Sequence, residues 1–236
     1  MKTHTTSPDY KGFRFSPEMI SHAVWLYFRF SLSFRDVEEL LAQRGIIVTY
    51  ETVRQWCLKF GQTSANEVRR RRPRCRDTWH MDEMVLTIQG KKHSLWRAVD
   101  QDGNVLDILV QSRRNKKAAS DFSVSCSRVW NTCRACSSPT NWPARPNESF
   151  SLAWSIGSTK GSGIRAEHSY QPTRQRERTM RRFKSAGHAQ RFLSACGPIS
   201  DHVRPRQHRL SAAEDHATMQ GRFQVWNEVT GVHRAA

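Results

Sequence analysis

The stretch that decides the fold runs from residue 78 to residue 111 and reads TWHMDEMVLTIQGKKHSLWRAVDQDGNVLDILVQ. Three apolar runs lie within it, at 78–88, 94–99 and 105–110. Each run has the length and composition of a β-strand. Gln89-Gly90-Lys91-Lys92 separates the first two runs, and Asp102-Gly103, a strong hairpin signal, separates the next two. The stretch therefore predicts three antiparallel strands.

The residues around these strands indicate how the domain continues and where its chemistry lies. Asn115-Lys116-Lys117-Ala118-Ala119 is typical of a helix start. Three antiparallel strands followed by a helix is how an α/β domain of the RNase H-like class begins, with a mixed sheet. Asp82 lies inside the first apolar strand, where a carboxylate is costly to bury unless it is exposed at a sheet edge or holds a cation.

Upstream, residues 16–70 predict three helices. Ser16-Pro17 and Ser33 open the first two, and Gly45 ends the second. Two helices joined by a short turn that contains glycine make a helix-turn-helix, whose last helix enters the major groove of DNA. The alternative is a three-helix bundle without a DNA role, but the basic run 69–72 favours DNA. The predicted DNA-contacting residues are Thr49, Tyr50, Thr52, Arg54, Gln55 and Lys59.

The composition is strongly basic, with a formal net charge of +17 and a pI near 10.4. Such a surplus favours polyanionic partners, because each neutralised phosphate releases a counterion. The sequence contains no run of 18 apolar residues and no secretory signal, so we expect a cytoplasmic protein without a membrane segment. Cys133 and Cys136, with Cys126 near them, have the spacing of zinc ligands, but no second pair accompanies them.

Residues 120–163 differ in composition and periodicity from the segments on both sides. They contain 11 serines in 44 residues and show no sustained helical or strand period. A packed α/β domain should have an apolar strand here. Periodicity returns after Gly163, where a basic stretch begins. Its predicted phosphate-contacting residues are Arg174, Arg176, Arg178 and Lys184.

Several motifs resemble, in order and spacing, the small DDE-type transposases of the insertion-sequence-six family. The resemblance covers residues 11–119 and 164–230. Its motifs in this chain are 35–41, 44–46, 50–56, 79–83, 95–103, 109–119, 165–167, 171–178 and 182–185.

The resemblance implies a set of catalytic residues. Asp82 would be the first catalytic carboxylate and Glu167 the third, and together they would bind Mg²⁺ for two-metal DNA strand transfer. In the family the second aspartate closes an apolar strand. By spacing it belongs near Thr140, but Asp121 and Glu148 are the only acidic residues between Gln111 and Ala166, and neither follows an apolar run.

Two explanations of the departure remain open. A pair of compensating frameshifts in the coding DNA would leave the segment translated in another frame, and this is the explanation we favour. The alternative is a divergent insertion, with the second carboxylate supplied elsewhere, for example by Asp121. Loss of a metal ligand and of a central strand predicts little or no strand-transfer activity.

The predicted organisation is an N-terminal arm, a helix-turn-helix domain, an RNase H-like DDE domain with an aberrant middle, and a C-terminal tail. The bounds are 1–15, 16–70, 77–195 with 120–163 aberrant, and 196–236. The expected partners are double-stranded DNA, both transposon ends and target, and further copies of the chain in a homodimer or larger oligomer. The expected function is DNA transposition, in which the chain binds insertion-sequence ends and, if intact, catalyses metal-dependent cleavage and strand transfer. The alternatives are a catalytically inactive DNA-binding remnant and an RNA binder that uses the basic charge.

Overall fold

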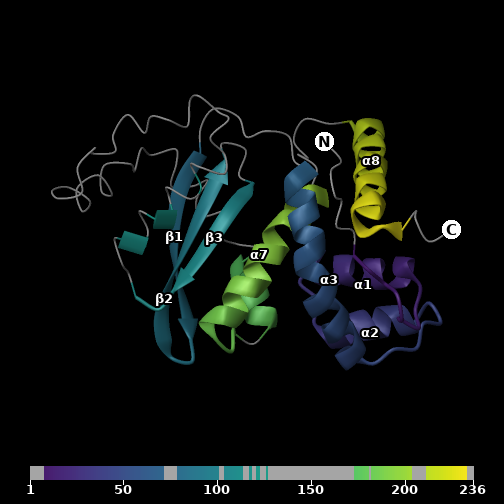
Figure 1. Ribbon diagram of the computed structural model, residues 1–236, viewed down its shortest axis with the longest axis horizontal. Helices are drawn as coiled ribbons and strands as arrows, with labels where there is room; N and C mark the ends of the chain where they lie inside the picture. Colours follow the sequence, from purple (N-terminus) through teal and green to yellow (C-terminus); the bar gives the residue numbers. More distant parts are fainter. Residues whose placement is uncertain are drawn as a thin grey trace. The chain divides into compact units, whose positions relative to one another are not determined.

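The computed structural model divides the chain into two compact units (Figure 1). The helical unit comprises residues 1–72 and 191–236, and the sheet unit comprises residues 73–190. The structure describes residues 8–71, 79–100, 104–113, 117–118, 121–122, 126, 173–180, 182–203 and 211–232.

Three helices open the helical unit, each with a start that its sequence explains. Ser16 is the extended N-cap of the first helix and is followed by proline. The second begins with a capping box, in which the Asp36 amide donates to Ser33 Oγ at 3.2 Å and the Ser33 amide donates to Asp36 Oδ2 at 2.7 Å. The helices are α1 (Pro17–Arg29), α2 (Phe34–Ala42) and α3 (Tyr50–Arg71).

Gly45 ends α2 as its position in the sequence predicts. Its φ is +76°, and its amide donates to the Ala42 carbonyl at 2.9 Å. The Ile46 amide donates to the Leu41 carbonyl at 3.0 Å, which completes a Schellman motif. Glycine is required because other residues rarely adopt this left-handed backbone.

The helices of this unit pack through aromatic side chains. Trp56 and Phe60 of α3 are almost fully buried, and Phe15 lies edge-on to Trp56 with 5.3 Å between ring centroids. A Cβ atom at Gly61 would lie 2.5 Å from the Phe28 ring of α1. The crossing of α1 and α3 therefore depends on the missing side chain at Gly61.

The C-terminal residues complete the helical unit. They supply α8 (Ala212–Thr230) and the part of α7 (Ala186–Val203) from residue 191 onward. Ser21 Oγ of α1 donates to Thr230 Oγ1 at 3.1 Å in a buried contact, and Phe192 stacks on Phe28. The association of α8 with α1 and α3 is not visible in the sequence, and the tertiary contacts alone reveal it.

The sheet unit contains three antiparallel strands in the order β1-β2-β3. Gln89 and Gly90 both have positive φ, 51° and 76°, as a tight hairpin between twisted strands requires. The strands are β1 (Trp79–Ile88), β2 (Lys91–Asp100) and β3 (Val105–Gln111). The three predicted strands are confirmed, and β2 begins three residues earlier than its apolar run.

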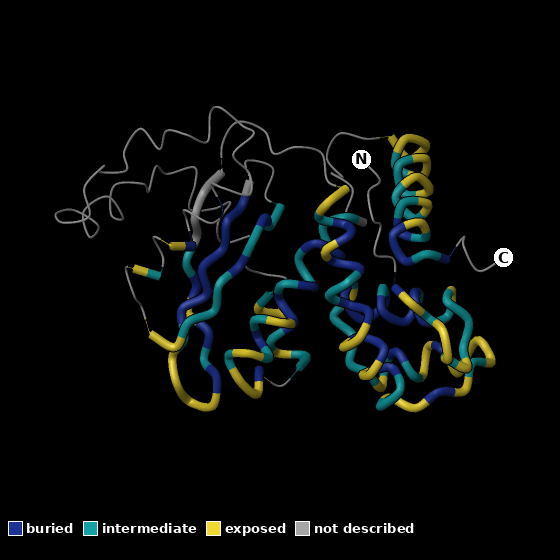
Figure 2. The backbone as a smooth tube through the Cα atoms, viewed as in Figure 1, coloured by how far each residue is buried: buried dark blue, intermediate teal, exposed yellow. Residues whose placement is uncertain are grey.

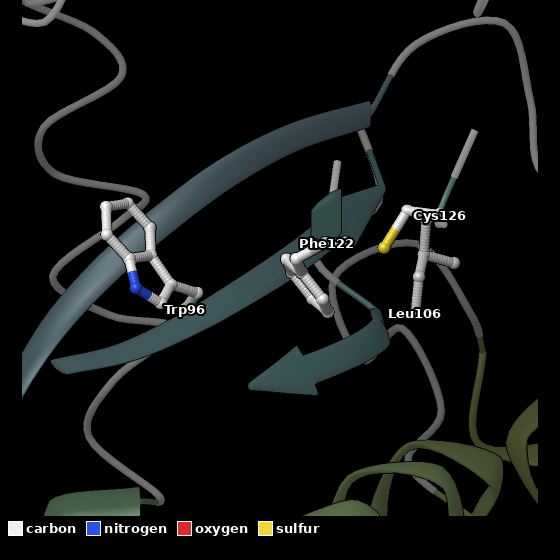
Figure 3. Packing of buried hydrophobic residues seen from close by; sticks show 5 residues of the cluster. Trp96, Leu106, Phe122 and Cys126 are labelled. Carbon is white, nitrogen blue, oxygen red and sulfur yellow. The ribbon is translucent and has the colours of Figure 1, made fainter. Parts of the chain in front are cut away.

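The middle strand is buried from Ser94 to Val99, which Figure 2 shows as a dark blue segment. Trp96 belongs to a core cluster with Ala98, Leu106, Phe122 and Cys126 (Figure 3). Phe122 and Cys126 both have helical backbone, and both are buried in this cluster. The chain thus still packs on the sheet at residues 122 and 126, beyond the predicted start of the aberrant segment at residue 120.

The side-chain amide of Gln190 binds the outer edge of β3. Its Oε1 accepts from the Val110 amide at 2.7 Å, and its Nε2 donates to the Ile108 carbonyl at 3.0 Å. One residue thus satisfies a donor and an acceptor that an edge strand would otherwise leave to water.

The described helices and three-stranded antiparallel sheet agree with the predicted α/β class. None of the helices in the described part of the chain is long and apolar enough to cross a membrane.

Candidate catalytic strand and nucleic-acid interface

Asp82 lies on β1, directly across from Arg97 of β2. By the two-residue repeat of a strand, position 82 shares its face of the sheet with Met84, Leu86 and Ile88, which are all buried. The side chain of Asp82 and the whole of Glu167 lie outside the described residues. The described residues contain no group of three or more His, Cys, Asp or Glu side chains that could hold a metal ion. That Asp82 and Glu167 bind a metal ion together therefore stays a prediction.

Arg97 is a residue that the sequence reasoning missed. It is only 3% exposed and stands opposite Asp82 in the register. A buried guanidinium is costly unless an anionic or strongly polar partner compensates it. The signal was present in the sequence as a single charge inside the apolar run 94–99.

The first half of α3 presents an exposed polar face. Val53, Trp56, Cys57 and Phe60 are buried, whereas Arg54, Gln55, Leu58 and Lys59 are exposed. Thr49 accepts the Thr52 amide at 3.3 Å and so caps the helix. Of the six predicted DNA-contacting residues, Thr52 is half-buried and the others are exposed, namely Thr49, Tyr50, Arg54, Gln55 and Lys59.

Glu51, which the sequence reasoning did not single out, organises this face. Arg54 Nε donates to Glu51 Oε2 at 2.8 Å, and Arg54 Nη2 donates to Glu51 Oε1 at 2.6 Å. Gln55 Nε2 makes a longer contact of 3.4 Å with Glu51 Oε1. The hydrogen bonds from Arg54 lower the pKa of Glu51, and those to Glu51 raise the pKa of Arg54. Both groups thus stay charged near neutral pH.

Aromatic rings position two further cations of the helical unit. The Lys59 ammonium lies 4.4 Å from the centre of the Phe13 ring, and the Arg35 guanidinium lies 5.3 Å from the Tyr50 ring. Cation–π contacts at exposed sites are worth about 0.5–1 kcal/mol.

The basic run after residue 68 belongs to α3 and is held within the helical unit. Arg69 Nη2 donates to the Ser194 carbonyl at 3.1 Å. Arg70 pairs with Glu67 on the same helix, and Arg71 pairs with Glu228 of α8 at 2.8 Å. Arg69 and Arg71 join helices of the unit and Arg70 is paired within α3, so these arginines give weaker support to DNA binding than the sequence alone suggests.

The sheet unit carries a hollow that we call the arginine hollow. It has a volume of about 510 Å³ and is lined by Val85, Thr87, Arg174, Glu177, Arg178 and Arg182. Its helical side is residues 173–179, and its strand side is the face of β1 opposite to that of position 82. Lys184 is exposed near this segment in the sequence, whereas Arg176 is only 3% exposed and does not reach the surface.

Cys126 is buried in the core cluster of the sheet unit. Burial, with the negative charge of Asp107 nearby, raises the pKa of its thiol to about 12. A zinc ligand must be a thiolate, which this site disfavours. Cys133 and Cys136 lie outside the described residues.

The comparisons with known proteins address the sheet unit directly. A family model described as a DDE domain matches residues 76–135, from just before β1 to beyond Cys126. This chain is similar to insertion-sequence transposases. It is 32% identical over 109 residues to the transposase for insertion sequence-like element IS431mec of Staphylococcus aureus, covering 46% of this chain and 49% of that protein. The transposase for insertion sequence element IS257 in transposon Tn4003, also from Staphylococcus aureus, matches to the same extent. No solved structure matches.

These matches confirm the resemblance inferred from the motifs. The chain spans about half the length of the curated transposases that it matches. The DDE match also ends at residue 135, so the resemblance extends 16 residues beyond its predicted limit of 119. This agrees with the packing of Phe122 and Cys126 on the sheet.

Proposed function

We propose that this chain is a DNA-binding protein of transposition whose sheet unit derives from a DDE catalytic domain. The helical unit would bind the ends of an insertion sequence through the exposed face of α3. The proposal is carried by the DDE match over residues 76–135, which spans all three strands and includes Asp82. The charge of +17 supports a polyanionic partner.

In an intact enzyme of this kind, divalent metal ions such as Mg²⁺ polarise the phosphate and activate the attacking hydroxyl. In this chain, Asp82 and Glu167 are the residues that would hold the metal. Asp82 lies on β1 opposite Arg97, which adds positive charge near that position.

We further propose that the chain has lost strand-transfer activity. The second carboxylate is missing from its expected place near Thr140, and the DDE match stops at residue 135. The frameshift hypothesis therefore narrows to codons 136–163. If neither alternative frame of these codons encodes an apolar strand that ends in aspartate, the hypothesis is wrong.

A cleavage and joining assay with Mg²⁺ separates the two candidate functions. The substrate is duplex DNA copied from the ends of the element that encodes the chain, and a mobility-shift assay on the same duplex measures binding. We expect a shift that prefers end DNA to scrambled DNA, without cleavage. Robust strand transfer would refute the loss of activity, and equal affinity for both duplexes and for RNA would favour the RNA-binding alternative.

Further copies of the chain would assemble on the ends as a homodimer or larger complex. This part of the proposal is tested by sedimentation of the chain with and without end DNA.

A further inference from the structure

The carboxylate of Glu51 fixes how Arg54, an exposed arginine in the first half of α3, is presented. Two N–H groups of Arg54, on Nε and Nη2, are bound by the two oxygens of Glu51. Both side chains are 44% exposed, so the pair sits at the surface of the helix rather than inside the unit. An isolated surface pair of this kind contributes little to stability. The geometry of the pair therefore says more about how Arg54 is presented to a ligand than about the stability of the fold.

The bidentate pair leaves one edge of the guanidinium available. An arginine has five N–H groups in a planar fork, and Glu51 binds the edge formed by Nε and Nη2. The edge formed by Nη1 and the second N–H of Nη2 can still donate two parallel hydrogen bonds. That is the arrangement by which an arginine recognises O6 and N7 of guanine in the major groove.

Holding the side chain in advance has two consequences for recognition. A free arginine loses about 2 kcal/mol of rotamer freedom when it is fixed on DNA, and a residue already held by Glu51 loses less. The negative charge of Glu51 also repels phosphates, which disfavours complexes in which Arg54 binds the DNA backbone instead of a base.

We infer that Glu51 is a positioning residue for specificity, which orients Arg54 to read a guanine in the bound DNA. This inference rests on the proposed function, because it assumes that the exposed face of α3 contacts DNA. It extends that function from affinity for DNA to the base read at one position.

The test compares four forms of the full chain: wild type, Glu51→Gln, Glu39→Gln and Arg54→Lys. Glu39 lies on α2 with an exposed side chain, so its substitution makes the same charge change without touching Arg54. Each form first selects duplexes from a randomised DNA pool. The affinity of each form for the wild-type consensus and for a scrambled duplex is then measured by fluorescence anisotropy at one salt concentration.

Wild type should select a guanine at one position, and Glu51→Gln should lose this preference. The ratio of consensus to scrambled affinity should fall about tenfold in Glu51→Gln, as expected for one bidentate base contact. Its affinity for scrambled DNA should stay equal or rise. Glu39→Gln should change both affinities in parallel and keep the ratio. Arg54→Lys, which keeps the charge but not the fork, should lose the same guanine.

Two results would overturn the inference, and they are distinguishable. A wild-type consensus that Glu51→Gln selects unchanged, with its folding verified by circular dichroism, would overturn the role of Glu51 alone. A wild-type chain that selects no consensus would overturn the proposed function of α3 and the inference with it.

Discussion

The two units of this chain use their arginines in different ways. Three arginines of the helical unit, Arg54, Arg70 and Arg71, form ion pairs with glutamates of the same unit. In the arginine hollow of the sheet unit, three arginines share the lining with one glutamate. None of the ion pairs formed among the described residues includes an arginine of the hollow.

This difference indicates that the two units contribute differently to DNA binding. A paired arginine is oriented, so it can distinguish one base from another, but its charge is already partly neutralised. An arginine without a carboxylate partner neutralises phosphate fully and adds affinity that depends on salt rather than on sequence. We therefore expect specificity to come from the helical unit and general affinity for DNA from the sheet unit.

The largest effect should come from removing one core tryptophan from either unit. Trp56→Ala and Trp96→Ala each delete a side chain that is at most 2% exposed, which typically costs about 3–5 kcal/mol of folding free energy. Trp56→Ala should abolish preference for end DNA, whereas Trp96→Ala should preserve it. Amide hydrogen exchange in α3 and in β2 would show which unit each substitution unfolds. If Trp96→Ala lost the preference for end DNA while the amides of α3 stayed protected from exchange, specificity would not come from the helical unit alone.

A smaller effect, with opposite signs at two matched positions, should follow from adding one methyl group. Gly61→Ala places a Cβ atom 2.5 Å from the Phe28 ring, so it should destabilise the helical unit by about 1–3 kcal/mol. Gly221 lies inside α8 with no atom within 4 Å of the added Cβ. Gly221→Ala should therefore stabilise the same unit by about 0.5–1 kcal/mol through helix propensity. Urea unfolding measures the change in unfolding free energy for both variants. If both changes had the same sign, α1 and α3 would not cross this closely.

The helix starts and the hairpin could be read from the sequence because their causes are local. A serine followed three residues later by an acidic residue predicts the box that begins α2, and Gly45 predicts its end. Gln89-Gly90 predicts the turn between β1 and β2 in the same way. Each of these signals acts through contacts within a few residues.

The features that the sequence did not predict depend on contacts between distant residues. The buried pair of Ser21 with Thr230 joins helices 209 positions apart, and no pattern within α8 identifies its partner. The burial of Arg176, in a run of arginines that otherwise line a surface, is likewise set by tertiary packing. Glu51 could have been found, since a glutamate three residues before an arginine on a helix is a recognised pair.

A moderate effect on binding should follow from removing charge in the arginine hollow. The double variant Arg174→Gln/Arg178→Gln should lower the slope of log affinity against log salt by about 0.9 for each phosphate that the protein no longer neutralises. The control Arg70→Gln/Arg71→Gln makes the same charge change at arginines paired within the helical unit and should leave the slope nearly unchanged. Anisotropy titrations of nonspecific duplex at several salt concentrations measure both. A larger change in the control would reverse the assignment of general affinity to the sheet unit.

The smallest effect should be local, at the edge of β3. Gln190→Ala removes both hydrogen bonds to the backbone of Val110 and Ile108, but Val110 is only half-buried, so water can replace part of the loss. We expect a cost of about 1 kcal/mol to the sheet unit and none to the helical unit. Exchange of the Val110 amide should accelerate, whereas the amides of α1 keep their protection. The matched control is Gln62→Ala in α3, which removes the bond from Ser194 instead. It should leave Val110 unaffected, because the bond between Gln62 and Ser194 lies wholly within the other unit.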